Sequence, residues 1–185
     1  DQDRFALPVD LNAISAKNGK WEVSKSGFKI WRIKISAKNS KGWILCFNEL
    51  KLPEGSSLYI YSADKKILKG AFTATNNGDI GKLTVGPIAG PDVIIEFNTF
   101  EKSGESIPFK IEKLYSVYKS NLNVPGTENS VLGDPAYNSS LPCMININCP
   151  EGSSYGKQKD GIVRILLAGD KGFYYCTGTL INNTK

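Results

Sequence analysis

The sequence predicts an all-β protein that begins with a β-sandwich, jelly-roll-like or immunoglobulin-like, over residues 1–118. Short segments in which apolar and polar residues alternate recur along this region, as in strands with one buried face. Gly, Pro, Asn and Ser separate these segments, and none of them has a convincing helical period. About seven or eight short strands result, a number typical of a sandwich.

The first strands can be placed from their apolar residues. An apolar cluster at 7–9 in an otherwise polar start predicts an amino-terminal strand or arm, and a strand-rich pattern begins at Trp21. Residues 43–47 are apolar on both faces, which predicts a covered central strand. Residues 28–35 alternate instead, and their apolar face carries Trp31, Ile33 and Ile35.

The remaining strands of the sandwich lie between turn signals. The sequence Asn76-Asn77-Gly78-Asp79 predicts a tight turn. Around it we expect strands at 58–61, 65–72, 83–85, 93–97 and 109–114, the second of them at a sheet edge.

Residues 119–142 are rich in Ser, Asn, Gly and Pro, and we interpret them as a linker between two domains. Beyond the linker, apolar segments at 161–168 and 173–181 flank Gly169-Asp170-Lys171-Gly172, which predicts a β-hairpin within 143–185. A lone hairpin is marginally stable at best in water. We therefore expect the sandwich or another polypeptide to cover it.

Composition excludes several classes of function. The chain has no histidine, so it lacks the commonest general base and the commonest transition-metal ligand, and we assign no catalytic residue, metal or cofactor. The net charge of +5 comes mostly from dispersed lysines, which predicts no nucleic-acid partner. No apolar run reaches the ~18–20 residues of a membrane span. The chain starts without an apolar signal core, so we expect that any export signal has already been removed.

The four cysteines fall into two groups. Cys46 alternates with apolar neighbours and is expected to be a small buried hydrophobe. Five residues separate Cys143 from Cys149, which is too wide for the usual zinc spacing, and Cys176 follows in the predicted hairpin. In an extracellular protein these three are predicted to be disulfide half-cystines; in a cytosolic one they would be reduced.

The three tryptophans all lie in the predicted sandwich. Trp31 and Trp43 share faces with aliphatic residues, so we expect them in the core. Trp21 is a weaker candidate for the core, and its ring is a candidate platform for stacking on a sugar.

The carboxyl-terminal segment contains three motifs in order: Cys143-x-Ile-x-x-x-Cys149-Pro-Glu-Gly, then Gly161-Ile-Val-Arg, then Cys176-Thr-Gly-Thr-Leu-Ile-Asn-Asn-Thr184. With these motifs it resembles the start of the bacterial lysyl endopeptidase family, secreted serine proteases of the chymotrypsin fold. The upstream region is similar to the part that precedes the protease in related bacterial precursors.

The resemblance implies that 143–185 is the first part of a chymotrypsin-like β-barrel and that the parent protein is a secreted serine endopeptidase acting on proteins or peptides. It implies that Cys176 pairs with a cysteine beside the catalytic histidine, and that Cys143 and Cys149 pair with cysteines further on. The whole triad would lie beyond Lys185, so these residues alone are expected to be inactive. The remaining protease domain is then the main partner, and Lys119 and Lys185 are candidate processing points.

Two other functions fit the same sequence. The sandwich could be a non-enzymatic module that binds glycan or cell-surface material while attached to a protease. The parent protein could also be a degenerate protease homologue kept for adhesion. Exposed, coplanar Trp21 and Tyr rings would favour glycan binding, whereas fully buried tryptophans would favour a pro-domain.

Overall fold

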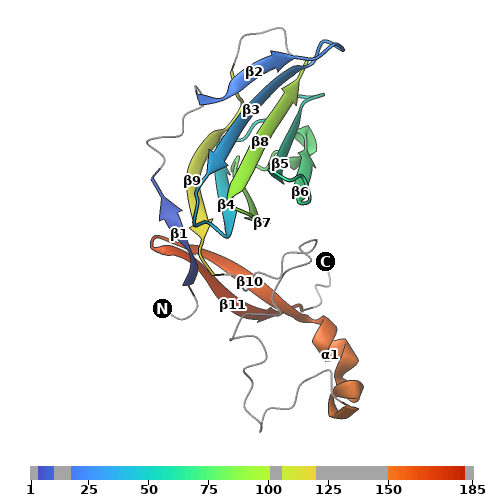
Figure 1. Cartoon of the computed structure of the whole chain (residues 1–185). Coiled ribbons are helices and arrows are strands. Elements are labelled where there is room, and N and C mark those ends of the chain that lie inside the picture. Colours follow the sequence, from blue (N-terminus) through green and yellow to red (C-terminus); the bar gives the residue numbers. More distant parts are fainter. Residues whose placement is uncertain (1–3, 11–17, 101–105, 120–149, 182–185) are drawn as a thin grey trace.

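The computed structural model describes residues 4–10, 18–100, 106–119 and 150–181, which form two antiparallel sheets and one short helix (Figure 1). The predicted all-β class is confirmed. The first sheet contains, in spatial order, β10 (Ile162–Gly169), β11 (Gly172–Thr179), β1 (Arg4–Val9), β9 (Lys110–Val117), β4 (Gly42–Asn48) and β7 (Leu83–Ala89). The second contains β2 (Lys20–Val23), β3 (Lys29–Ser36), β8 (Asp92–Thr99), β5 (Ser57–Ser62) and β6 (Leu68–Phe72).

The two sheets pack against each other around an aromatic cluster. The ring of Phe109, just before β9, meets those of Trp31, Phe47 and Phe97 edge to face, with ring centroids 6.0, 5.4 and 6.0 Å apart. Edge-to-face contacts of this kind add to the free energy already gained by burying large rings. Trp31 and Trp43 are both fully buried, which confirms their predicted place in the core.

The strand pattern of the second sheet follows the sequence closely. Along β3, Trp31, Ile33 and Ile35 are buried, as predicted, because successive side chains of a strand point to opposite faces. Strand β6 lies at a sheet edge, which confirms the interpretation of 65–72. The predicted turn at 76–79 lies between β6 and β7, where a short 3-10 helix at Ala74–Asn76 is followed by a turn closed by a hydrogen bond from the Gly81 N–H to the Gly78 carbonyl.

Strand β7 is longer than the sequence predicted. The sequence placed a strand at 83–85 and a loop at Gly86-Pro87, but β7 continues through Pro87 to Ala89. Proline cannot donate a hydrogen bond to a ladder, so strands tolerate it at a sheet edge. Because β7 is an edge strand, its free side accommodates Pro87.

Two short elements near residue 155 were not predicted. A 3-10 helix spans Pro150–Tyr155, and α1 follows at Gly156–Asp160. Such short helices bury almost nothing here, so they leave no apolar period in the sequence.

Residues 42–47 of strand β4 are all buried, which confirms the prediction of a covered strand. Its inner face packs on the second sheet, where Phe47 meets Phe109. On the outer face, Ile44 lies opposite Tyr115 of β9, and Tyr115 packs edge to face on Phe173 of β11 at 4.6 Å. Phe173 of the hairpin therefore packs on Tyr115 at this face.

The predicted β-hairpin is present, since β10 pairs with β11 along the full length of both strands. It extends the first sheet, because β11 also pairs with β1, and it lies at the end of the sandwich where β1 and β9 meet it (Figure 1). The predicted linker 119–142 lies almost wholly outside the described residues, so the domain boundaries stay predictions. Within the described ranges, no helix is long and apolar enough to span a membrane.

The aromatic cluster gives a test of the fold. Phe109→Ala is expected to lower the free energy of unfolding by about 3–5 kcal/mol, because it removes a buried ring that contacts three others. Phe100→Ala is the control, since Phe100 is 56% exposed, and it should cost about 1 kcal/mol or less. Urea unfolding followed by tryptophan fluorescence measures both, and equal losses would contradict this core.

Candidate functional site

The hairpin has two faces of different character. Residues opposite each other in a ladder point to the same side, and the register pairs Ile165 with Cys176 and Leu167 with Tyr174. These four residues therefore share one face with Val163, which we call the open hairpin face. Phe173 and Tyr175 alternate with them and lie on the other face.

The face with Phe173 and Tyr175 packs on the sandwich. Phe173 is 2% exposed and lies edge to face against Phe5 as well as Tyr115. The Tyr175 ring stacks on that of Phe5, with centroids 4.0 Å apart and planes 12° apart. The guanidinium carbon of Arg164 lies 4.9 Å from the Tyr175 ring centroid, within cation–π range. This aromatic junction fixes the hairpin to the sandwich.

The register of β1 against β11 shifts by one residue at Phe5. Arg4 lies opposite Tyr174 and Ala6 opposite Phe173, so two steps on β1 match one step on β11, and Phe5 is the extra residue. A bulge of this kind bends a strand locally and redirects its side chain. Phe5 is fully buried between the two parts as a result.

The open hairpin face is apolar and largely exposed in the described structure. Ile165 is 39% exposed and Leu167 49%, and Cys176 is exposed as well. Three neighbours outside this face, Ile162, Leu180 and Ile181, are also exposed. Contiguous apolar surface on a hairpin is typical of a face that another layer covers.

The described cysteines differ in environment. Cys46 is a buried free thiol, as predicted; burial raises its pKa, while its contact with the Thr84 hydroxyl at 3.6 Å acts to lower it. Cys176 is a free, exposed thiol on the open hairpin face. Cys143 and Cys149 lie outside the described residues, so the disulfides proposed for all three stay predictions.

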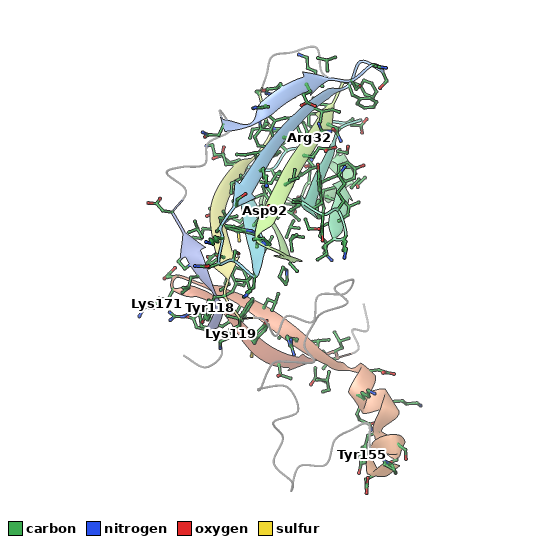
Figure 2. All side chains as sticks on the ribbon, in the orientation of Figure 1. Arg32, Asp92, Tyr118, Lys119, Tyr155 and Lys171 are labelled. Atoms are coloured by element: carbon green, nitrogen blue, oxygen red, sulfur yellow. The ribbon has the colours of Figure 1, made fainter. Side chains whose placement is uncertain are left out.

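Lys119 lies two residues after the end of β9, near the junction (Figure 2). Its neighbour Tyr118 donates its backbone N–H to the Phe5 carbonyl and its hydroxyl to the Arg4 carbonyl. The residues before Lys119 are therefore held in the sheet. Lys185, the second candidate processing point, lies outside the described residues.

Trp21 is partly buried and packs on the core. It lies opposite Trp31 in the β2–β3 ladder, and its ring meets that of Phe97 edge to face at 6.4 Å. The two other tryptophans are fully buried. No flat, freely exposed tryptophan row is therefore present in the described residues.

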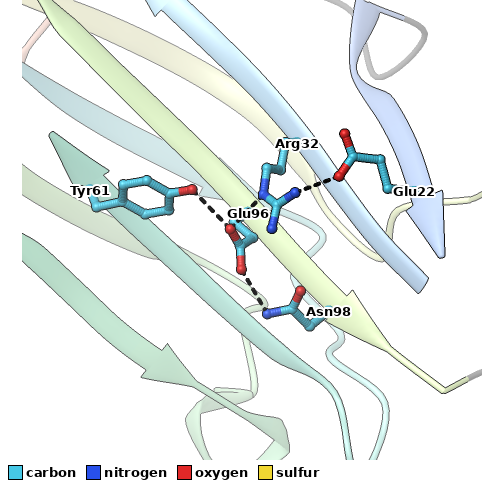
Figure 3. A network of polar contacts seen from close by, with 5 residues as sticks. All are labelled: Glu22, Arg32, Tyr61, Glu96 and Asn98. Carbon is cyan, nitrogen blue, oxygen red and sulfur yellow. Dashed lines mark hydrogen bonds and ion pairs between the residues drawn. The ribbon is translucent and has the colours of Figure 1, made fainter. Parts of the chain in front are cut away.

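A polar network on the outer face of the second sheet was not predicted (Figure 3). The Glu96 carboxylate accepts hydrogen bonds from Arg32 Nε at 2.7 Å, the Tyr61 hydroxyl at 2.8 Å and Asn98 Nδ2 at 3.1 Å. Arg32 Nη1 also donates to Glu22 at 2.8 Å. In the sequence, each of these residues occupies a position of its strand (β2, β3, β8 or β5) that points away from the core, and this pattern is the signal for the network. It is not sufficient, because strand order cannot be read from one sequence.

The network fixes the charge states of its members. Burial acts to raise the pKa of Glu96, but hydrogen bonds from Arg32, Asn98 and Tyr61 outweigh it, so the Glu96 pKa is lowered. The hydrogen bond to Glu96 raises the pKa of Arg32 against the effect of burial. Burial, and then the bond to Glu96, raise the pKa of Tyr61. An ionised, fully engaged carboxylate is suited to holding strands together and poorly suited to accepting a proton.

A hollow of about 620 Å³ opens between the end of β1 and β3. Val9, Ile35 and Trp43 contribute to its apolar floor, and Lys20 and Arg32 to its charged rim. Its described lining contains no cysteine and none of the predicted site residues. In the described part of the chain, no three His, Cys, Asp or Glu side chains are grouped so as to hold a metal ion.

Comparison with known families gives one match. Residues 137–185 match the family model described as "Lysyl endopeptidase, C-terminal domain". The match begins within the predicted linker and includes both strands of the hairpin, and it relates this end of the chain to lysyl endopeptidases. No solved structure matches the chain.

Glu96 gives a prediction on pH dependence. Because its pKa is lower in the folded state, its contribution to stability is present above about pH 4.3, the ordinary glutamate pKa, and is lost as the pH falls through the folded value. Glu96→Gln should lower the free energy of unfolding at pH 7 by about 1–3 kcal/mol and flatten the loss of stability below about pH 5. Glu22→Gln is the control, because the Glu22 side chain is 65% exposed. Urea unfolding at several pH values measures both, and an unchanged pH profile in Glu96→Gln would contradict the network.

Tyr175 gives a second prediction. Its hydroxyl is buried without a hydrogen-bond partner, and burial raises its pKa to about 12. The neutral phenol therefore stabilises the fold below about pH 10, and this contribution is lost as the pH rises toward 12. Tyr175→Phe should remove one late step from the ultraviolet titration of tyrosinate, and it should leave stability at pH 7 unchanged or raised by up to about 1–3 kcal/mol. Tyr155→Phe, at an exposed ring, is the control; a stability loss in Tyr175→Phe would show that the hydroxyl has a partner.

Proposed function

We propose that this chain is the amino-terminal part of a secreted serine endopeptidase related to lysyl endopeptidases. In this proposal the two-sheet sandwich is a pro-domain or accessory domain, and the hairpin β10–β11 begins the protease domain. The observation that carries the proposal is the family match over 137–185, which includes the hairpin and none of the sandwich strands.

The open hairpin face supports the proposal. Ile165 and Leu167 stay exposed on it although the opposite face is packed on the sandwich. Apolar sheet faces are stable in water when a second layer covers them. We propose that the remaining protease domain is this layer and supplies the catalytic histidine, aspartate and serine.

The cysteines and lysines take roles that follow from this arrangement. Cys176, exposed on the open hairpin face, would be reachable by a cysteine of the covering layer, and Cys143 and Cys149 are proposed to pair with that domain too. A cut directly after Lys119 would require the end of β9 to leave the sheet, because Tyr118 is hydrogen-bonded to β1. A cut nearer the middle of the linker would not.

The test uses the full reading frame that contains this sequence. We expect the full protein to hydrolyse peptide bonds that follow lysine in a protein substrate. This activity should be lost when its predicted nucleophilic serine is replaced by alanine. The chain 1–185 alone is expected to be inactive. A full protein with no peptidase activity on lysyl or arginyl peptides would contradict the proposal.

A matched pair of variants tests the open hairpin face. Ile165→Asp should lower the yield of active protease about tenfold or more, because a buried unpaired carboxylate costs several kcal/mol. Ile162→Asp changes another exposed isoleucine, three residues away on the other face, and should change the yield much less. Equal yields from the two variants would show that the covering layer does not contact this face.

A further inference from the structure

Strand β1 belongs to two ladders at once. Ala6 lies opposite Val117 of β9 on one side and opposite Phe173 of β11 on the other. β1 is therefore the only strand among the described residues through which the hairpin is hydrogen-bonded to the rest of the first sheet.

The sandwich side of β1 is the more extensively bonded. Four consecutive residues, 6–9, are paired with β9. Tyr118 adds two hydrogen bonds, from its backbone N–H to Phe5 and from its hydroxyl to Arg4. β1 is thus fixed to the sandwich and presents its opposite edge, together with the Phe5 ring, to the hairpin.

The hairpin fits this edge closely. Phe5 stacks on Tyr175 and meets Phe173 edge to face. Gly172 begins β11 with a φ of +143°, and a Cβ placed on it would lie 2.2 Å from the Ala6 carbonyl oxygen. The backbones approach so closely that only glycine fits at this position.

None of these contacts depends on the segment 120–149, which is the route by which the chain passes from the sandwich to the hairpin. No disulfide joins the two parts either, because Cys46 is the only cysteine before residue 143 and it is a free thiol. The attachment at β1 is therefore entirely non-covalent.

We propose that β1 is a clasp that keeps the hairpin bound to the sandwich after the chain between them has been cut. The binding surface on the sandwich consists of the β1 edge that is not paired with β9, together with Phe5 and Tyr115. The segment that occupies this surface is β11, with Phe173 and Tyr175. Its biological consequence rests on the proposed function: a maturation cut in 120–142 would leave the sandwich bound to the protease domain, and release would require β1 and β11 to separate.

The test uses the whole chain with a site-specific protease sequence inserted between Gly133 and Asp134. After complete cutting, we expect the fragments 1–133 and 134–185 to elute together from a size-exclusion column under native conditions. Fragments that separate at once on cutting would overturn the proposal.

Two tyrosines on opposite faces of β11 give matched variants. Tyr175→Ala removes the ring that stacks on Phe5 and should weaken the association of the cut fragments by about tenfold or more, measured by serial dilution. Tyr174→Ala removes the same side chain from the open hairpin face and should weaken it much less. Equal effects would show that the aromatic junction does not hold the fragments together.

A second pair covers the case in which Tyr175→Ala fails to fold. Gly172→Ala directs a methyl group at the Ala6 carbonyl and should release the hairpin on cutting, whereas Gly156→Ala, with nothing within 4 Å, should not. All three tryptophans lie in the sandwich, so their fluorescence reports whether that part stays folded. If the full protein hydrolyses no peptide, the proposed function is refuted. The test of β1 is unaffected by that result, because the added protease cuts the chain and the chain itself needs no peptidase activity.

Discussion

The six-stranded sheet depends on the placement of one residue, Phe5. Its ring fills the space between β1 and β11, where it is fully buried against Phe173 and Tyr175. The one-residue register shift at this point lets two consecutive residues of β1, Phe5 and Ala6, both be buried at the joint. Burial of a large ring at this point joins two parts of the chain that are more than 150 positions apart in sequence.

The pairing of β1 with β11 stabilises both the sandwich and the hairpin. Without the hairpin, β1 would expose an unpaired edge, and Tyr115 would lose the Phe173 ring that packs on it. Without the sandwich, the hairpin would be an isolated two-stranded element, which is marginally stable in water. Pairing covers the facing edges of β1 and β11 and buries Phe173 at the same time, so each part stabilises the other.

The sequence was sufficient for the strands whose apolar pattern is set by one sheet packing on another. The alternation of Trp31, Ile33 and Ile35 and the double-sided burial of residues 43–47 were both correctly predicted. It could not show what covers the outer side of β4, because the answer lies in pairing between residues 4–9 and 172–179. Pairing over such a distance follows from strand order and from a register shift at Phe5, and neither leaves a periodic signal in a single sequence.

The same limit explains why the polar network was missed. The alternation along 28–35 puts Arg32 on the face opposite Trp31 and Ile33, but its partners Glu96 and Tyr61 lie on strands that only the sheet order brings beside β3. All of the candidate site that could be predicted lies in one continuous stretch, the hairpin with Cys176, since local turn and strand signals define it.

The two faces of the hairpin constrain how a larger protein could be built around it. Phe5 already packs on one face of the hairpin and β1 on one of its strand edges, so the face that carries Ile165 and Leu167 is the one left free of the sandwich for a further layer. That face is apolar over both strands, whereas the residues that hold the opposite face are aromatic and packed. A covering domain could therefore dock without displacing the sandwich. It follows that binding of the sandwich and completion of the proposed barrel are compatible events, and that the order in which they occur is not dictated by competition for a shared surface.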